Sequence, residues 1–304
     1  MSSSGEFVAP SGMRPRGSSM GPRDPKPRAV VPAPSAAAPA APGGGDSDDT
    51  LYGSRSAPAR HDELKLCGLA AVKARFARDP GSIKRLFFDH ETGQRVGVIC
   101  RALAQQKKVY RQVEPAELEK ISGSIHHGGI VAVVYAPPLR FATSADAIQW
   151  AKKGETVLVL DRIGNAHNLG AIARTAAFFG VPRMVIPDDP LAAKPTDAAH
   201  RVAEGGFEQL EVWQTKDLAI FARELSAAGY EVIGATVRGG RPDAPHAKER
   251  KPLALLLGNE ERGLAADVTA ACTRLVTIPG SGKIESLNVS VAAAVLMWEL
   301  LARR

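Results

Sequence analysis

The chain has 304 residues, of which 44% are hydrophobic, and carries a formal net charge of +7 with a sequence pI near 9.4. This length allows one large or two medium domains, and the basic excess is typical of proteins with an acidic partner such as nucleic acid. No run of about twenty apolar residues occurs and no apolar block follows the N-terminus, so we expect neither a membrane span nor a secretory signal.

The three cysteines, Cys67, Cys100 and Cys272, lie far apart, and none belongs to a CxxC pair. An odd number of isolated cysteines favours reduced core thiols over metal ligands or a disulfide. We therefore expect a cytoplasmic protein without a metal site.

Residues 1–60 are rich in Pro, Ala, Gly and Ser. Such a composition cannot bury enough apolar surface to offset the entropy of ordering, which predicts a disordered tail. A spacer is the favoured interpretation, and weak salt-sensitive contact with RNA is the alternative.

Residues 61–136 alternate helical and extended patterns, which predicts a small α/β domain. We expect helices at 67–78, 94–106 and 115–121, and strands at 84–88, 109–113 and 130–134. Basic residues crowd one end of this domain, and either an RNA-binding or a merely solvated surface would explain them: Lys65, Lys73, Arg75, Arg78, Lys84 and Arg85. His126 and His127 lack a third ligand at metal spacing and indicate a turn.

Residues 137–154 begin with paired prolines and predict a linker that contains a short helix. In residues 155–304 we expect strands at 156–160, 183–186, 210–213, 231–235, 253–257 and 275–278, and helices at 169–179, 198–204, 216–228 and 289–300. This alternation is typical of a mostly parallel sheet with helices on both faces. Residues 238–250, with prolines and mixed charges, predict a mobile surface loop.

The helix expected at 169–179 has Asn168 as a candidate N-cap and Gly180 as a stop. Its apolar side chains recur at helical spacing and form a single stripe. Arg174 lies off that stripe, so it can project toward a ligand crevice.

Polar loops follow the strands expected at 253–257 and 275–278. If these strands are neighbours, both loops meet in the crevice where open α/β sheets bind ligands. The glycines at 280 and 282 match no nucleotide-binding loop, because Thr277 and Ile284 break the phosphate-loop pattern and Glu285 breaks the dinucleotide pattern. The final helix is apolar on nearly every side, with Ser286 or Asn288 as its cap, and requires burial in the core or against another subunit.

Three segments, NAHNLGAIARTAAFFGV at 165–181, LLLGNEERGL at 255–264 and IPGSGKIESLNVSVAAAV at 278–295, together closely resemble the three motifs of the SPOUT-class TrmH (SpoU) RNA ribose 2'-O-methyltransferases. Residues 66–134 resemble the smaller RNA substrate-binding domain, of ribosomal protein L30e type, that precedes the catalytic domain in many members. The long tail resembles that of the YfiF-like members.

This resemblance implies a deep trefoil knot in the catalytic domain and a homodimer formed through the knotted region. It implies S-adenosylmethionine as the cofactor, held by backbone groups of three loops: Leu257, Gly258 and Asn259, then Ile278, Pro279 and Gly280, then Ser286 and Leu287. By motif position, the family's functional residues match Asn168, Arg174, Glu260, Ser286 and Asn288.

The family assigns Arg174 to activation of the ribose hydroxyl. Since arginine is normally fully protonated, Arg174 either takes the proton with help or only orients the RNA. Glu260 is expected to orient Arg174 or the methionine part of the cofactor. The resemblance predicts an enzyme acting on ribosomal RNA; transfer RNA, or a non-catalytic RNA-binding role, are the alternatives.

The sequence departs from the family's pattern in three places. Ala166 replaces a common proline, Glu261 replaces a usual glycine, and VAEGGFEQL at 202–210 replaces a typical Ser-Gly-Ala stretch.

Purely structural roles would also explain the candidate site residues: Asn168, Ser286 and Asn288 could be helix caps only, and Arg174 and Glu260 could form only an ion pair.

Overall fold

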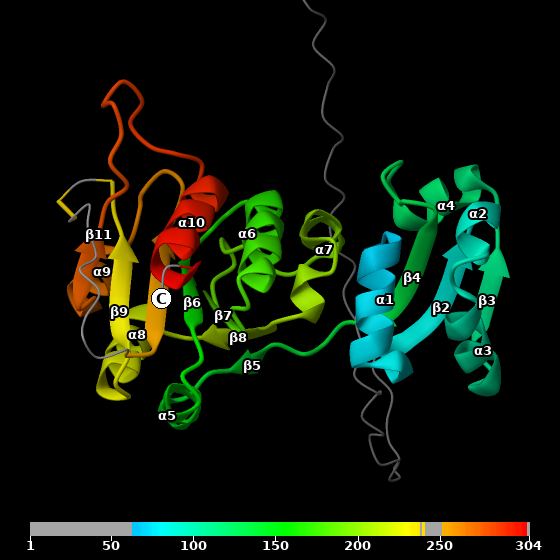
Figure 1. Ribbon diagram of the computed structural model, residues 1–304, viewed down its shortest axis with the longest axis horizontal. Helices are drawn as coiled ribbons and strands as arrows, with labels where there is room; N and C mark the ends of the chain where they lie inside the picture. The colour runs from blue at the N-terminus through cyan, green and yellow to red at the C-terminus, as the bar shows by residue number, and fades with distance from the viewer. Residues whose placement is uncertain (1–62, 238, 241–250, 303–304) are drawn as a thin grey trace, which may run out of the picture. The chain divides into compact units, whose positions relative to one another are not determined.

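The computed structural model describes residues 63–237, 239–240 and 251–302, which form two α/β regions (Figure 1). The expected tail at 1–60 and nearly all of the expected loop at 238–250 lie outside the described residues. Within the described ranges, no helix is long and apolar enough to cross a bilayer.

The smaller region contains a four-stranded mixed sheet in the order β1-β4-β2-β3. Only β2 and β3 are parallel; β4 runs antiparallel to both of its neighbours. The strands are β1 (Glu63–Cys67), β2 (Ile83–Phe88), β3 (Val109–Gln112) and β4 (Ile130–Tyr135). The helices are α1 (Leu69–Arg78), α2 (His90–Gly93), α3 (Gly97–Gln105) and α4 (Pro115–Ser122).

Two helix boundaries in this region differ from those expected. The helix expected from residue 67 begins at Leu69, because Cys67 ends strand β1 and Gly68 turns the chain with φ 89°. The helix expected at 94–106 is confirmed as α3, although it begins at Gly97. Residues His90–Gly93 form a separate helix, α2, which was not predicted; Asp89 caps it by accepting a hydrogen bond from the Thr92 backbone N–H at 2.8 Å.

The larger region contains a seven-stranded sheet in the order β11-β9-β10-β6-β7-β8-β5, and every neighbouring pair is parallel. Its strands are β5 (Arg140–Phe141), β6 (Val157–Asp161), β7 (Arg183–Pro187), β8 (Glu211–Thr215), β9 (Glu231–Ala235), β10 (Leu253–Gly258) and β11 (Arg274–Val276). The expectation that the last two strands are neighbours was wrong, because β9 lies between them.

Helices cover both faces of this sheet, as the alternation of strands and helices predicted. One core contains side chains of α6 (Ala166–Phe178), α7 (Asp197–Ala203) and α10 (Val289–Met297), which continues into a π-helix at Trp298–Ala302. The opposite core contains α5 (Ser144–Lys152), α8 (Leu218–Ala227) and α9 (Ala266–Ala271), of which α9 was not predicted. Figure 1 shows α6 and α10 side by side above β6.

Burial explains why the central strands are so apolar. All five residues of β6 are buried, and so are Leu253–Leu257 of β10. A strand covered by helices on both faces has no solvent side, so its pattern is a continuous apolar run. Each fully buried Leu or Val contributes about 1.5–3 kcal/mol.

The smaller region contacts the larger one through a buried ion pair. Arg75 Nε of α1 lies 2.9 Å from Glu208 Oε2, and the two side chains are 6% and 1% exposed. Nearby, Arg78 Nη1 donates to the backbone carbonyls of Phe207, Glu208 and Leu210. Two arginines that were expected on an RNA-binding or solvated surface therefore hold the two regions together.

The same cluster contains His200, which is 4% exposed and packs against Phe207 with ring centroids 4.7 Å apart. Burial lowers the pKa of His200 to about 3, and the neighbouring Arg75 guanidinium adds to this effect. Burial raises the pKa of Glu208, against the opposing charge of Arg75. His200 is therefore neutral in the folded protein at physiological pH.

His200 should make stability depend on pH. The pKa of His200 is near 6.5 in the unfolded chain and lower in the folded protein, so the unfolded chain binds more protons between these two values. The stabilising contribution of neutral His200 is therefore complete above pH 6.5 and falls as the pH decreases toward 3. Between pH 7.5 and 5 this amounts to about 2 kcal/mol of unfolding free energy. We expect His200→Asn to lose that part of the pH dependence in urea denaturation at both pH values, while Glu208 still titrates in both proteins. An equal pH dependence in both proteins would contradict a buried neutral His200.

Candidate functional site

Strands β6 and β10 are parallel neighbours, so their carboxyl ends meet at one edge of the sheet. Asp161 ends β6 and pairs in register with Gly258, which ends β10. Although only 2% exposed, the Asp161 carboxylate accepts hydrogen bonds from the Ala265 backbone N–H at 2.7 Å and from Arg162 Nε at 2.8 Å. The hydrogen bond to Asp161 raises the pKa of Arg162.

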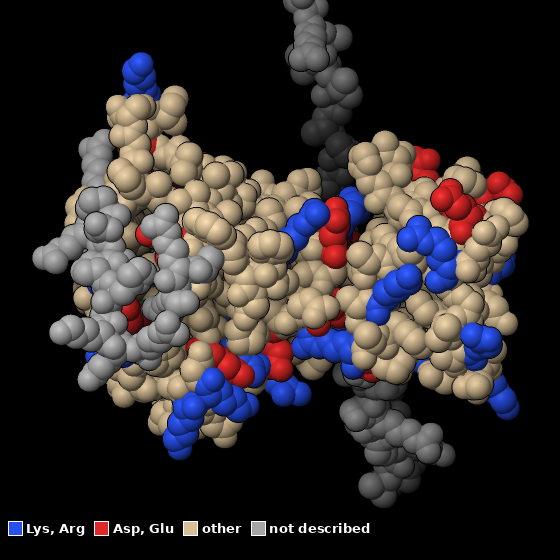
Figure 2. All heavy atoms as spheres, in the orientation of Figure 1, with Lys and Arg blue, Asp and Glu red and all other residues tan. Residues whose placement is uncertain are grey.

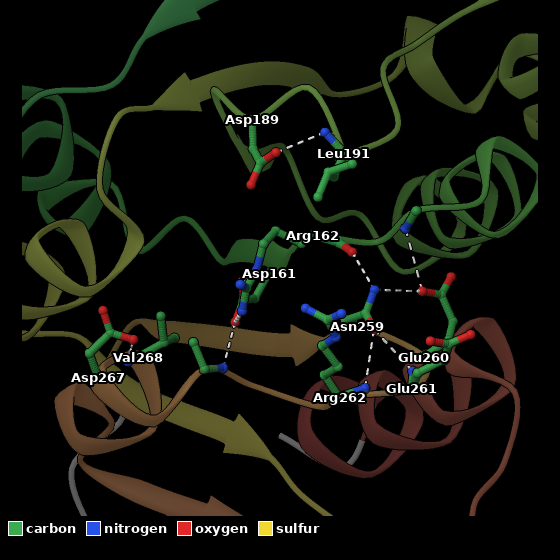
Figure 3. Close-up of polar contacts among 12 residues, drawn as sticks. Asp161, Arg162, Asp189, Leu191, Asn259, Glu260, Glu261, Arg262, Asp267 and Val268 are labelled. Atoms are coloured by element: carbon green, nitrogen blue, oxygen red, sulfur yellow. Dashed lines mark hydrogen bonds and ion pairs between the residues drawn. The ribbon is translucent and has the colours of Figure 1, made fainter.

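Asn259 joins the loops that follow these two strands (Figure 3). Its Nδ2 donates to the Arg162 carbonyl at 2.8 Å, and its Oδ1 accepts from the backbone N–H groups of Glu261 and Arg262 at 3.0 and 3.1 Å. Its backbone also exchanges two hydrogen bonds with Gly263. The Asn259 side chain therefore closes the loop after β10, which contains the second motif, and connects it to the loop after β6, which leads into the first motif.

A chain of side-chain hydrogen bonds connects all three motifs. Asn168 Nδ2 donates to Glu260 Oε1 at 2.8 Å, and Asn288 Nδ2 donates to Asn168 Oδ1 at 3.1 Å. The three residues come from α6, the loop after β10 and the N-terminus of α10. Residues separated by about a hundred positions therefore meet in one polar cluster.

The expectation that Asn168 caps its helix was wrong. Helix α6 begins at Ala166, and Asn165 is the N-cap, accepting a hydrogen bond from the His167 backbone N–H at 2.7 Å. Because the cap is one turn earlier, the Asn168 side chain is available to Glu260 and Asn288. Asn288 does act as a cap: it accepts from the Ser290 backbone N–H at 2.9 Å while its amide contacts Asn168.

Arg174 lies in a different place from the one expected. It forms an ion pair with Glu204, with Nη1 to Oε1 at 2.9 Å, and its side chain is 57% exposed. Glu260 instead contacts Asn168 and the Gly164 backbone N–H. Since Arg174 follows Asn168 by six residues on the same helix, the two are separated by roughly 9 Å along the axis.

A cavity of about 660 Å³ opens beside this cluster. Glu260 lines it, as do six of the residues expected to bind a cofactor: Leu257, Gly258, Asn259, Ile278, Ser286 and Leu287. Pro279 and Gly280 are exposed and outside its lining, and Asn168, Arg174 and Asn288 are also outside it. Glu261, which replaces a usual glycine, faces the cavity.

Sequence reasoning missed Asp161, Arg162 and Glu204. A carboxylate at the end of an otherwise apolar buried strand was the available signal for Asp161, because buried charges require partners. Arg162 gave no such signal; its φ of 55° is visible only in the folded backbone. Asn259 was expected to use backbone groups, yet its side chain makes the contacts that close the loop.

Comparison with known proteins shows which family this chain belongs to. Residues 155–298 match the model of the SpoU rRNA Methylase family, and residues 65–139 match the model for RNA 2'-O ribose methyltransferase substrate binding. A 23S rRNA (guanosine-2'-O-)-methyltransferase RlmB from Nitrosomonas europaea is 33% identical over 76% of this chain and 88% of its own length. The chain belongs to the SpoU rRNA methylase family.

A second relative and a solved structure are also similar to this SpoU protein. An uncharacterized tRNA/rRNA methyltransferase YfiF from Escherichia coli O157:H7 is 32% identical over 79% of the chain and 68% of its own length. The crystal structure of an AdoMet-bound rRNA methyltransferase from Sinorhizobium meliloti has a TM-score of 0.64 at 23% identity, covering 78% of this chain and 86% of the other. That structural likeness confirms the α/β fold.

The loop after β10 leaves no room for a side chain at Gly258. A Cβ there would lie 2.2 Å from the Gly263 carbonyl carbon and the Leu264 nitrogen. We therefore expect Gly258→Ala to displace the second-motif loop and lower the unfolding free energy by about 1–3 kcal/mol. The matched control is Gly280→Ala, because a Cβ at Gly280 meets nothing within 4 Å. Equal losses in thermal unfolding of the two variants would contradict the close packing at Gly258.

Proposed function

We propose that this SpoU protein is an S-adenosylmethionine-dependent RNA ribose 2'-O-methyltransferase that acts on ribosomal RNA in the cytoplasm. The observation that carries the proposal is the match to both family models in one chain, with the Asn168, Glu260 and Asn288 cluster beside a cavity. Similarity to a 23S rRNA methyltransferase favours ribosomal over transfer RNA as the substrate.

The cavity fits S-adenosylmethionine in size and chemistry. Its volume of about 660 Å³ lies within the range of sites for small molecules. Leu257, Ile278 and Leu287 offer an apolar surface for the adenine ring, while Glu260 and Ser286 offer partners for polar groups. The close backbone approach at Gly258 gives the cavity a wall of main-chain atoms. When bound, the cofactor would supply an electrophilic methyl group.

The residues of this chain would then act mainly by positioning. Asn168, Glu260 and Asn288 fix the three loops around the cavity, so that a ribose hydroxyl can be held in line with the methyl group. Arg174, charged and largely exposed, is suited to orient the phosphate or ribose of the RNA. We assign Arg174 this orienting role; a literal base would have to lose a proton that guanidinium groups retain in proteins.

Arg174→Ala should strongly reduce methyl transfer without weakening the binding of the cofactor. Since Arg174 lies outside the cavity lining, calorimetry should give the same affinity for S-adenosylmethionine as the unchanged protein. Transfer of labelled methyl groups to total RNA should decrease about 100-fold or more, because misplaced reactants lose that much rate.

Arg223→Ala is the matched control, because Arg223 is an exposed arginine on α8, which packs on the other face of the sheet. It should retain both binding and transfer. Cofactor binding without transfer by the unchanged protein would indicate a non-catalytic RNA-binding protein, and label in transfer RNA alone would overturn the ribosomal assignment.

We also propose that the protein is a homodimer formed through α10 and the end of α6, around a trefoil knot of the third-motif segment. Four apolar residues on these helices are solvent-exposed in the single chain: Phe178 at 83%, Val291 at 49%, Val295 at 40% and Trp298 at 55%. Phe179 links two of them, with ring centroids 5.2 Å from Phe178 and 6.4 Å from Trp298. Figure 2 shows few charged atoms over α6, which suits an interface core.

Trp298→Glu should convert the dimer to a monomer, because it places a charge where apolar surface would be desolvated. Sedimentation equilibrium would measure the mass of each protein. Ile220→Glu is the matched control: Ile220 is 50% exposed, but it lies on α8 on the other face of the sheet. An unchanged mass for the Trp298 variant would exclude α10 as the interface.

A further inference from the structure

The turn at Glu204–Glu208 contacts the Arg174 side chain from one end. Glu204 Oε1 lies 2.9 Å from Arg174 Nη1. Glu204 is the C-cap of α7 and lies in the left-handed region with φ 46°, and its backbone N–H donates to the His200 carbonyl. That conformation costs a non-glycine residue about 1–2 kcal/mol, and such strain concentrates at functional positions.

The backbone of the turn packs closely against two helices, α6 and α1. A Cβ on Gly206 would lie 2.8 Å from the Cα of Arg174 in α6. A Cβ on Gly205 would lie 3.2 Å from the Cα of Ala71 in α1, and Gly205 has φ 93°. Helix α6 carries the arginine, and α1 belongs to the smaller region that matches the substrate-binding model. The two glycines therefore allow one turn to contact both.

The smaller region also binds the other end of the turn, around Glu208. Glu208 forms its buried ion pair with Arg75, and Arg78 Nη1 donates to the carbonyls of Phe207, Glu208 and Leu210 at 3.1, 3.0 and 2.8 Å. Breaking a buried ion pair leaves an uncompensated charge, so this end of the turn is firmly held. The turn thus runs from a fixed contact with the smaller region to the guanidinium of Arg174.

We propose that the turn at Glu204–Glu208 couples the substrate-binding region to Arg174, and that Glu204 is the positioning residue that orients the Arg174 guanidinium. This inference rests on the proposed methyltransferase function. An exposed ion pair alone contributes little, typically below about 1 kcal/mol; here the backbone contacts of the turn fix the carboxylate. With Nη1 held by Glu204, the remaining N–H groups of Arg174 are aimed at the RNA.

The first test is Glu204→Gln, which retains the size of the side chain and removes its charge. We expect kcat to decrease about tenfold, in keeping with loss of a charge-assisted hydrogen bond. The KM for RNA and the affinity for S-adenosylmethionine should be unchanged, a division that general loss of structure would not produce. Glu224→Gln is the matched control, because Glu224 lies on α8 on the other face of the sheet.

Two outcomes of this test would overturn the positioning role. An unchanged kcat together with an unchanged KM for RNA would mean that the contact between Glu204 and Arg174 has no part in the reaction. A lower KM for RNA with unchanged kcat would mean that Glu204 competes with an RNA phosphate for the arginine and does not orient it.

The second test is Arg78→Gln, which loosens the turn from the side of the smaller region without leaving a buried charge. We expect a similar decrease of kcat and, in the double variant with Glu204→Gln, no further decrease, because both changes act through one path. Arg101→Gln, an exposed arginine on α3, is the control. Additive effects of the two substitutions would contradict coupling through the turn.

Hydrogen exchange separates this inference from the proposed function. If the unchanged protein transfers no methyl group, the proposed reaction fails, yet Arg78→Gln should still speed exchange of α6 amides near Arg174 if the turn couples the regions. Unaltered exchange in α6 would reject the coupling even in an active enzyme.

Discussion

The hydrogen bond from Asn259 Nδ2 to the Arg162 carbonyl is the contact on which the candidate site depends. It joins the loops after β6 and β10, and the buried Asp161 carboxylate reinforces it by accepting from the Ala265 backbone N–H. Because both loops are held at their bases, Glu260 and Asn168 are brought within 2.8 Å of each other. The geometry of the cavity therefore follows from a few polar contacts at the ends of two apolar strands.

Local patterns predicted most of the larger region well, because its strands are buried on both faces and its helices alternate with them. They failed where two residues compete for one local role. Asn165 and Asn168 are both good caps, and only the folded structure shows that Asn165 caps α6 while Asn168 reaches Glu260. Sheet order was equally inaccessible: β9 separates β10 and β11 through long-range pairing that no local pattern encodes.

The positions of charged residues along the sequence predicted the contacts of the site less reliably than the other patterns did. The basic residues of the smaller region indicated an acidic partner, yet Arg75 is buried against Glu208, and Lys84 and Arg85 both pair with Glu63. Arg174 was expected near Glu260, but its partner Glu204 lies in a segment that departs from the family's usual sequence. Partners of opposite charge far apart in the chain are decided by tertiary packing, so counting charges along the sequence could not identify them.

The edge of the large sheet has a consequence for where the catalytic unit begins. Strand β5 pairs with β8, and Trp150 of α5 packs edge-on against Trp213 with ring centroids 5.3 Å apart. Strand β5 and helix α5 both precede residue 155, where the match to the SpoU methylase model starts. A protein that begins at residue 155 would have β8 as an unpaired edge strand and would expose the Trp213 ring to solvent. Unpaired edge strands promote aggregation through strand pairing between molecules. Anyone isolating this half of the protein should keep the residues from about Leu139 onward.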